Sequence, residues 1–172
     1  MKKNLLIFLF FVIGLGAYSQ PAVKIFAFEQ ESSPGTVPAG VKDENGNPVK
    51  KAAAKEIYFV FLSFKKTSSI KPIQIFIKGK SFSIQAIEIR ESPVEYTDNT
   101  IPNKPEKNIL IPQTSNKVIE IKLNNAYTTQ KKSFYLQKLA KSNEVVVSYL
   151  WHKKKYFIAL KNIKKLKPLV NE

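Results

Sequence analysis

Few residues of this chain are suited to acid–base or nucleophilic chemistry. The sequence has one histidine, His152, and no cysteine. A catalytic triad needs a histidine whose second ring nitrogen is held by a carboxylate, but three lysines follow His152 and no acidic residue lies between Glu144 and Glu172. Without cysteine there is no thiol nucleophile, no disulfide framework and no Cys/His zinc site. We therefore predict a turn histidine, and no catalytic, cofactor-binding or metal residue.

Neighbouring carboxylates are the remaining candidates for general acid–base chemistry. Hydrolysis of a glycosidic bond needs two acids that face each other across a cleft. Three acidic pairs occur in the sequence, and they lie at an expected strand end, in a turn and on an outward strand position: Glu29/Glu31, Asp43/Glu44 and Glu88/Glu91. Solvation explains each of these placements, so the chain is predicted not to be an enzyme.

The stretch that begins at Asp43 opens like a calcium-binding loop, with oxygen-bearing side chains at alternate positions. Such a loop has glycine at its sixth position and a bidentate glutamate at its twelfth. Pro48 and Ala54 occupy those two positions here. The stretch is therefore predicted to be a turn and not a metal site.

The elements that would position any site are mainly strands, because the apolar residues recur with a period of two. Strands are expected at 22–29, 57–64, 73–77, 82–89, 118–123, 144–151 and 155–163. Hairpins are expected at Gly79 and at residues 152–154, a bulge at Ala86–Ile87, and one short helix near 133–141. The predicted fold class is an all-β, antiparallel β-sandwich, loosely immunoglobulin-like, and a partly open β-barrel is the alternative.

The same periodicity predicts the core. These residues are expected to be buried: Ile25, Ile57, Phe59, Phe61, Ile75, Ile77, Ile84, Ile89, Ile119, Ile121, Val147 and Ile158. At 172 residues, the chain is long enough for one domain with a core of its own.

Residues 1–19 have the pattern of a cleaved export signal. Lys2 and Lys3 precede an apolar run over 5–15, and Ala17-Tyr18-Ser19 offers a small-x-small cleavage site. The run is shorter than the roughly 18 residues that a membrane-spanning helix needs. The junction of Ser19 and Gln20 resembles those of Gram-negative envelope signals, which implies a periplasmic or extracellular protein. We expect a single β-rich domain over 20–172 and no transmembrane span after cleavage.

Positive charge is concentrated near the C-terminus. The whole chain carries 28 Lys+Arg against 13 Asp+Glu, and residues 131–172 alone hold 11 lysines against two acids. Aromatic residues are interleaved with these lysines around the second hairpin. The predicted interaction surface consists of Tyr149, Trp151, His152, Lys153, Lys154, Lys155 and Tyr156.

This surface suggests a binding domain. One hypothesis is a non-catalytic envelope domain that binds a protein or glycan partner. The alternative is an electrostatic binder of an anionic polymer or a membrane surface. Arg90 is the only arginine, which argues against sequence-specific nucleic acid, since bidentate guanine readout is mainly an arginine function.

Overall fold

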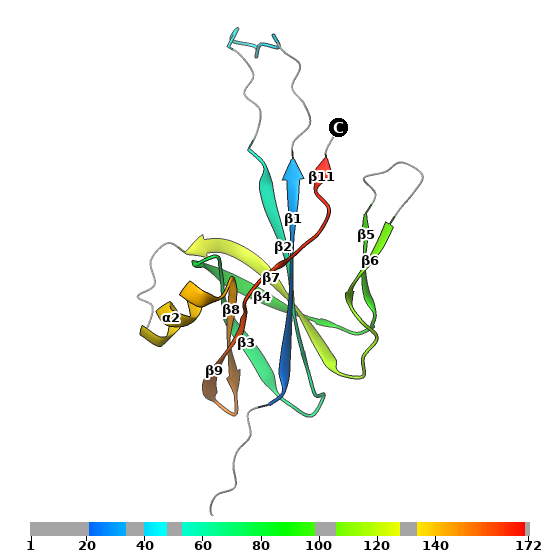
Figure 1. Cartoon of the computed structure of the whole chain (residues 1–172), viewed down its shortest axis with the longest axis vertical. Helices are drawn as coiled ribbons and strands as arrows, with labels where there is room; N and C mark the ends of the chain where they lie inside the picture. Colours follow the sequence, from blue (N-terminus) through cyan, green and yellow to red (C-terminus); the bar gives the residue numbers. More distant parts are fainter. Residues whose placement is uncertain (1–20, 34–39, 48–52, 99–105, 128–133, 171–172) are drawn as a thin grey trace, which may run out of the picture.

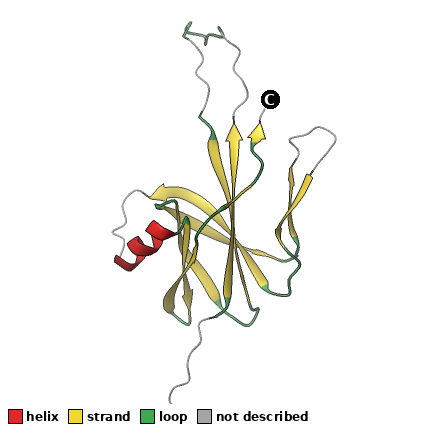
Figure 2. Ribbon diagram, viewed as in Figure 1, coloured by secondary structure: helices red, strands yellow, loops and turns green. Residues whose placement is uncertain are grey.

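The computed structural model describes residues 21–33, 40–47, 53–98, 106–127 and 134–170. The predicted signal segment, residues 1–19, lies outside this part of the chain. The strands are β1 (Val23–Ser33), β2 (Lys55–Phe64), β3 (Ile70–Ile77), β4 (Lys80–Ile89), β5 (Val94–Asp98), β6 (Glu106–Ile111), β7 (Lys117–Tyr127), β8 (Val145–Trp151), β9 (Lys154–Leu160), β10 (Lys164–Lys165) and β11 (Leu169–Val170). Helix α2 (Phe134–Ser142) is short, and strands dominate the described residues (Figure 2).

The main architecture is one large sheet that curls into a half-barrel (Figure 1). Its strands lie in the order β10-β1-β2-β7-β4-β3-β8-β9, and β5 and β6 form a second, small sheet. The predicted all-β class is confirmed, and the curled sheet corresponds to the partly open barrel named as the alternative. The large sheet is mixed, because β10 and β11 run parallel to β1.

The concave face of the half-barrel holds the largest cluster of buried side chains. Alternate residues of the strands point into it, as the period of two requires. Its buried members are Ala27, Val60, Leu62, Phe64, Ile70, Ile75, Ile77, Ile119, Ile121, Val145, Val147, Tyr149 and Ile163.

Two smaller clusters cover parts of the convex face. The β5–β6 hairpin contributes Leu110 and Ile111, which pack against Phe28, Phe61 and Val118 of the large sheet. Helix α2 contributes Leu136, which packs against residues of β3 and β8. None of the described helical segments has the length and apolarity that a membrane crossing requires.

Two details of the predicted core and sheet are wrong. Ile57 was predicted to be buried but is 37% exposed, because it lies near the start of β2 outside all three clusters. Every other predicted core residue belongs to a cluster or packs against one. The irregularity of β4 falls between Phe82 and Ile84 and not at residues 86–87. The change of phase at residues 86–87 has another cause, which is that the two faces of β4 pack against different clusters. Ile84 packs against the concave cluster, whereas Ile89 packs against the convex one.

The chain itself joins the two edges of the large sheet. β9 forms one edge and β10 the other, and residues 161–163 connect them. The amide of Ile163 donates to Glu144 Oε2 at 2.6 Å, and the amide of Glu144 donates to the carbonyl of Lys161 at 3.2 Å. Ile163 is also buried in the concave cluster. A covalent connection, anchored by one carboxylate, therefore closes this side of the half-barrel.

A buried glutamine ties the C-terminal segment to both sheets. Gln30 of β1 is 1% exposed. Its Nε2 donates to the carbonyl of Lys167 at 2.9 Å, and its Oε1 accepts from the hydroxyl of Tyr96 at 2.8 Å. Gln30 therefore connects β1 with β5 of the small sheet and with the segment between β10 and β11.

Candidate functional site

The second predicted hairpin is present and has a two-residue turn. Trp151 and Lys154 pair across β8 and β9, which leaves His152 and Lys153 at the turn. Their φ angles are 48° and 62°, so both adopt the left-handed conformation of a type I′ turn. Asn-Gly is the usual sequence for this turn, because most other residues are strained there.

We expect the double substitution His152→Asn/Lys153→Gly to raise the free energy of unfolding by about 1–2 kcal/mol, because the left-handed conformation costs roughly that much per ordinary residue. Denaturant titration would measure the change. His152→Ala/Lys153→Ala is the matched control, since it removes the same side chains and the same charge but keeps a Cβ at both positions. Equal stability of the two variants would contradict this account of the turn.

Aromatic rings line the inner side of this hairpin. Tyr149 is buried and stacks on Tyr156, with ring centroids 5.8 Å apart. Tyr156 contacts Trp151 at 5.7 Å, and Trp151 contacts His152 at 4.6 Å. Burial raises the pKa of Tyr149, with a smaller contribution from Tyr156. Tyr149 was predicted to belong to the interaction surface, but it is 3% exposed and packs against Tyr156 beneath the more exposed rings.

A hollow of about 380 Å³ lies beside these rings, and Trp151, His152, Lys154 and Tyr156 line it. The side chain of Lys155 lies on the other face of the hairpin, with its Nζ 5.5 Å from the ring of Phe157. We call residues 152–155 the basic tip; all four are exposed. The structure thus combines an aromatic wall with a cationic rim at one place.

The topology brings further cations to the same end of the molecule. Neighbouring strands from β1 to β9 along the sheet are antiparallel, so the starts of β1, β3, β7 and β9 and the ends of β2, β4 and β8 share one edge. The start of β1 and the basic tip lie at the lower end of Figure 1. We call this the basic end, and its cationic residues are Lys24, Lys65, Lys66, Lys71, Arg90, Lys117, Lys153, Lys154 and Lys155.

In the part of the chain that the structure describes, the acidic residues at these strand ends are Glu88 and Glu91. Glu88 is neutralised by Lys117, with 2.7 Å between Oε2 and Nζ. All the cations of the basic end except Lys117 are exposed. Sequence reasoning missed the cations outside the tip because they are scattered along the chain. Their position in the sequence could have identified them, because each lies at or next to a strand end that falls on this edge of the sheet.

The opposite end of the half-barrel carries charges of both signs, and we call it the mixed end. Its strand ends and turns carry these charged residues: Lys55, Lys78, Lys80, Lys161, Glu29, Glu31, Glu56 and Glu144. Two further cations, Lys164 and Lys165 of β10, pair with Phe28 and Glu29 of β1 at the same end. Cations outnumber acids at both ends, and the excess is larger at the basic end.

An ion cluster at the mixed end joins β1 and β2 to the turn between β3 and β4. Lys78 Nζ lies 2.7 Å from Glu29 Oε1 and 3.3 Å from Glu56 Oε1. The Tyr58 hydroxyl donates to Glu56. Burial, followed by this hydrogen bond, raises the pKa of Tyr58 to about 12, whereas the bonds from Tyr58 and Lys78 lower the pKa of Glu56. The hydrogen bond to Glu29 raises the pKa of Lys78. Both carboxylates are thus paired with the ammonium group of Lys78.

The stretch that begins at Asp43 is a turn, as predicted. Asp43 Oδ1 accepts from the amides of Asn45 and Asn47 at 2.9 and 2.8 Å, and Gly46 has a φ of 78°. Within the described part of the chain, histidine and acidic residues do not gather into groups of three or more that could hold a metal ion.

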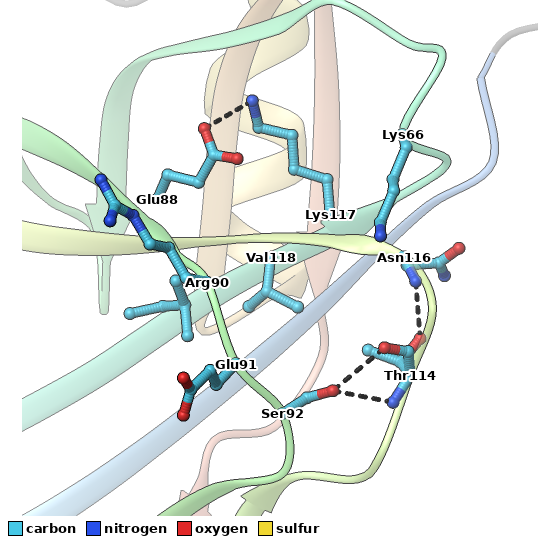
Figure 3. A pocket seen from close by; sticks show the side chains of 10 residues that line it. Lys66, Glu88, Arg90, Glu91, Ser92, Thr114, Asn116, Lys117 and Val118 are labelled. Atoms are coloured by element: carbon cyan, nitrogen blue, oxygen red, sulfur yellow. Dashed lines mark hydrogen bonds and ion pairs between the residues drawn. The ribbon is translucent and has the colours of Figure 1, made fainter.

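A second hollow, of about 340 Å³, lies at the basic end away from the tip, and we call it the arginine pocket. It is formed by the β2–β3 loop, the end of β4 and the start of β7 (Figure 3). Its lining residues are Lys66, Glu88, Ile89, Arg90, Glu91, Ser92, Thr114, Asn116, Lys117 and Val118.

Comparison with known proteins finds no matching family model, no similar curated protein and no similar solved structure.

Proposed function

We propose that this protein is an exported, non-catalytic envelope domain that binds an anionic glycan through its basic end. The observation that carries the proposal is the pairing of the basic tip with the hollow walled by Trp151 and Tyr156. The apolar faces of sugar rings can pack on such aromatic side chains, while acidic groups of the same polymer pair with lysine. The export signal predicted at residues 1–19 would bring the domain to a compartment where envelope glycans occur.

Charge supports a long-range attraction as well as a contact. The described acidic residues of the basic end are outnumbered by its cations, and the tip itself carries three adjacent lysines. At physiological salt the Debye length is about 8 Å, so neighbouring exposed lysines reinforce one another's field. A polyanion would therefore approach this end in preference to the mixed end.

The direct test is binding to immobilised polygalacturonate, a polymer of carboxylated sugars. Lys153→Glu/Lys154→Glu/Lys155→Glu is expected to weaken binding about tenfold or more and to elute at lower salt, because it replaces attraction by repulsion at the tip. The matched control is Lys55→Glu/Lys80→Glu/Lys161→Glu, which makes the same change in net charge at exposed lysines of the mixed end. Circular dichroism would check that both variants fold.

The two variants separate a site from general attraction. Equal elution of the two would show that net charge alone governs retention, and would reject the tip as a binding site. Vesicles that contain anionic lipid provide the second comparison. Tip-dependent binding to vesicles without binding to polygalacturonate would reject the glycan and favour a membrane surface.

A further inference from the structure

We infer that the arginine pocket is a second subsite of the basic end, which receives a carboxylated sugar of the same chain that contacts the basic tip. The inference rests on the proposed glycan-binding function and extends it to a place and a chemical class of ligand.

The pocket has a firm wall of hydrogen-bonded polar groups. Ser92 Oγ accepts from the amide of Thr114 and donates to its carbonyl, both at 3.0 Å. Thr114 Oγ1 accepts from the amide of Asn116 at 3.1 Å, and Asn116 Nδ2 donates to Ser63 Oγ at 3.3 Å. These bonds hold the segment before β7 against the segment after β4. This side of the pocket is therefore held in place by hydrogen bonds within the protein.

The charges that line the pocket leave positive charge in excess. The ion pair of Lys117 with Glu88 removes one charge of each sign. Lys66 and Arg90 are exposed, and within the described residues neither is part of an ion pair. Figure 3 shows Lys66 and Arg90 on opposite sides of the view, and the Glu91 carboxylate points away from the Arg90 guanidinium. Outside the Lys117–Glu88 ion pair, two cations and one acid thus line the pocket.

This combination fits an acidic sugar better than a bare anion. The planar guanidinium of Arg90 can bind a carboxylate with two parallel hydrogen bonds, and Lys66 can supply a second positive charge. Glu91 can accept hydrogen bonds from sugar hydroxyls, a role that a site for a simple anion would not need. The polar groups of Thr114 and Asn116 add further partners on the opposite side.

The pocket and the basic tip are placed so that one extended ligand can reach both. They lie on the same edge of the half-barrel. The β2–β3 loop, which contains Lys65 and Lys66, leads into β3, and β3 pairs with β8 of the hairpin. A polymer with a carboxylate on each sugar would meet cations along this edge. Binding at two subsites of one chain raises the affinity of long ligands more than that of short ones.

The experiment compares Lys66→Met/Arg90→Met with the matched control Lys55→Met/Lys80→Met, using calorimetric titration with long galacturonate oligomers. We expect the pocket variant to bind about tenfold more weakly than the wild type, and the control to stay within twofold. Arg90→Lys should also lose affinity, because it keeps the charge but loses the planar fork. Fully methyl-esterified oligomers should not distinguish the wild type from the pocket variant.

The outcomes separate this inference from the function on which it rests. If the tip variant loses affinity while Lys66→Met/Arg90→Met binds like its control, the second subsite is rejected and the proposed function stands. If the wild type does not bind the oligomers, both proposals are rejected. If Arg90→Lys binds like the wild type, the assignment of a carboxylate to Arg90 is rejected. All substituted residues are exposed, so thermal unfolding should be unchanged in each variant.

Discussion

Phe64→Ala is expected to lower the free energy of unfolding by about 3–5 kcal/mol, the usual cost of truncating a buried aromatic side chain. Phe64 is fully buried at the end of β2, among the concave cluster. The loss has two sources, the apolar area that is no longer buried and the cavity that remains. Urea denaturation followed by circular dichroism would measure it.

The chain contains a matched control for this substitution. Phe134 is 84% exposed at the start of α2, so Phe134→Ala is expected to change stability by no more than about 0.5 kcal/mol. Similar effects of the two substitutions would contradict the assignment of Phe64 to the core.

Gln30→Ala is expected to destabilise the fold by about 2–4 kcal/mol, because two buried hydrogen-bonding groups lose their partner. One is the Tyr96 hydroxyl, and the other is the Lys167 carbonyl. Gln85→Ala is the control, since Gln85 is an exposed strand glutamine of β4. The same denaturation experiment would compare the two variants. If Gln30→Ala lowers the free energy of unfolding no more than Gln85→Ala does, the hydrogen bonds of Gln30 do not hold the two sheets together.

The strands and hairpins of this fold were accessible from sequence because they depend on local pattern. The alternation at 118–123 predicted β7, and the apolar runs at 57–64 and 144–151 predicted β2 and β8. Gly79 predicted a tight turn, which lies at Lys78–Gly79. These signals are local because the pleat of a strand and the φ angle of a turn residue are properties of a few neighbouring residues.

The non-local parts of the fold were not accessible. β10 consists of two lysines, and β11 is equally short, so neither has a hydrophobic alternation to reveal it. Their place in the sheet depends on backbone pairing with β1 and on the hydrogen bond from Gln30 to the segment between them. A pattern of apolar and polar side chains does not predict backbone hydrogen bonds to a strand that is distant in sequence.

The candidate site was predictable to the same extent. The turn, the aromatic residues and the lysines of the tip are close in sequence, and the structure brings them together. Lys66 and Arg90, in contrast, lie in different loops, and only the order of the strands places them in one pocket. Because strand order was not predicted, neither residue was assigned to a surface.

The pairing of β1 with β10 and β11 has a consequence for the order in which the native sheet can assemble. A chain is synthesised from its N-terminus, and Gln30 is separated by 137 positions from the carbonyl that it binds. The first strand therefore waits for residues 164–170 before its outer edge is paired. Contacts between such distant positions carry a large loop-closure entropy and slow the folding of β proteins. The nascent chain consequently carries an unpaired edge of β1 until residues 164–170 have been synthesised.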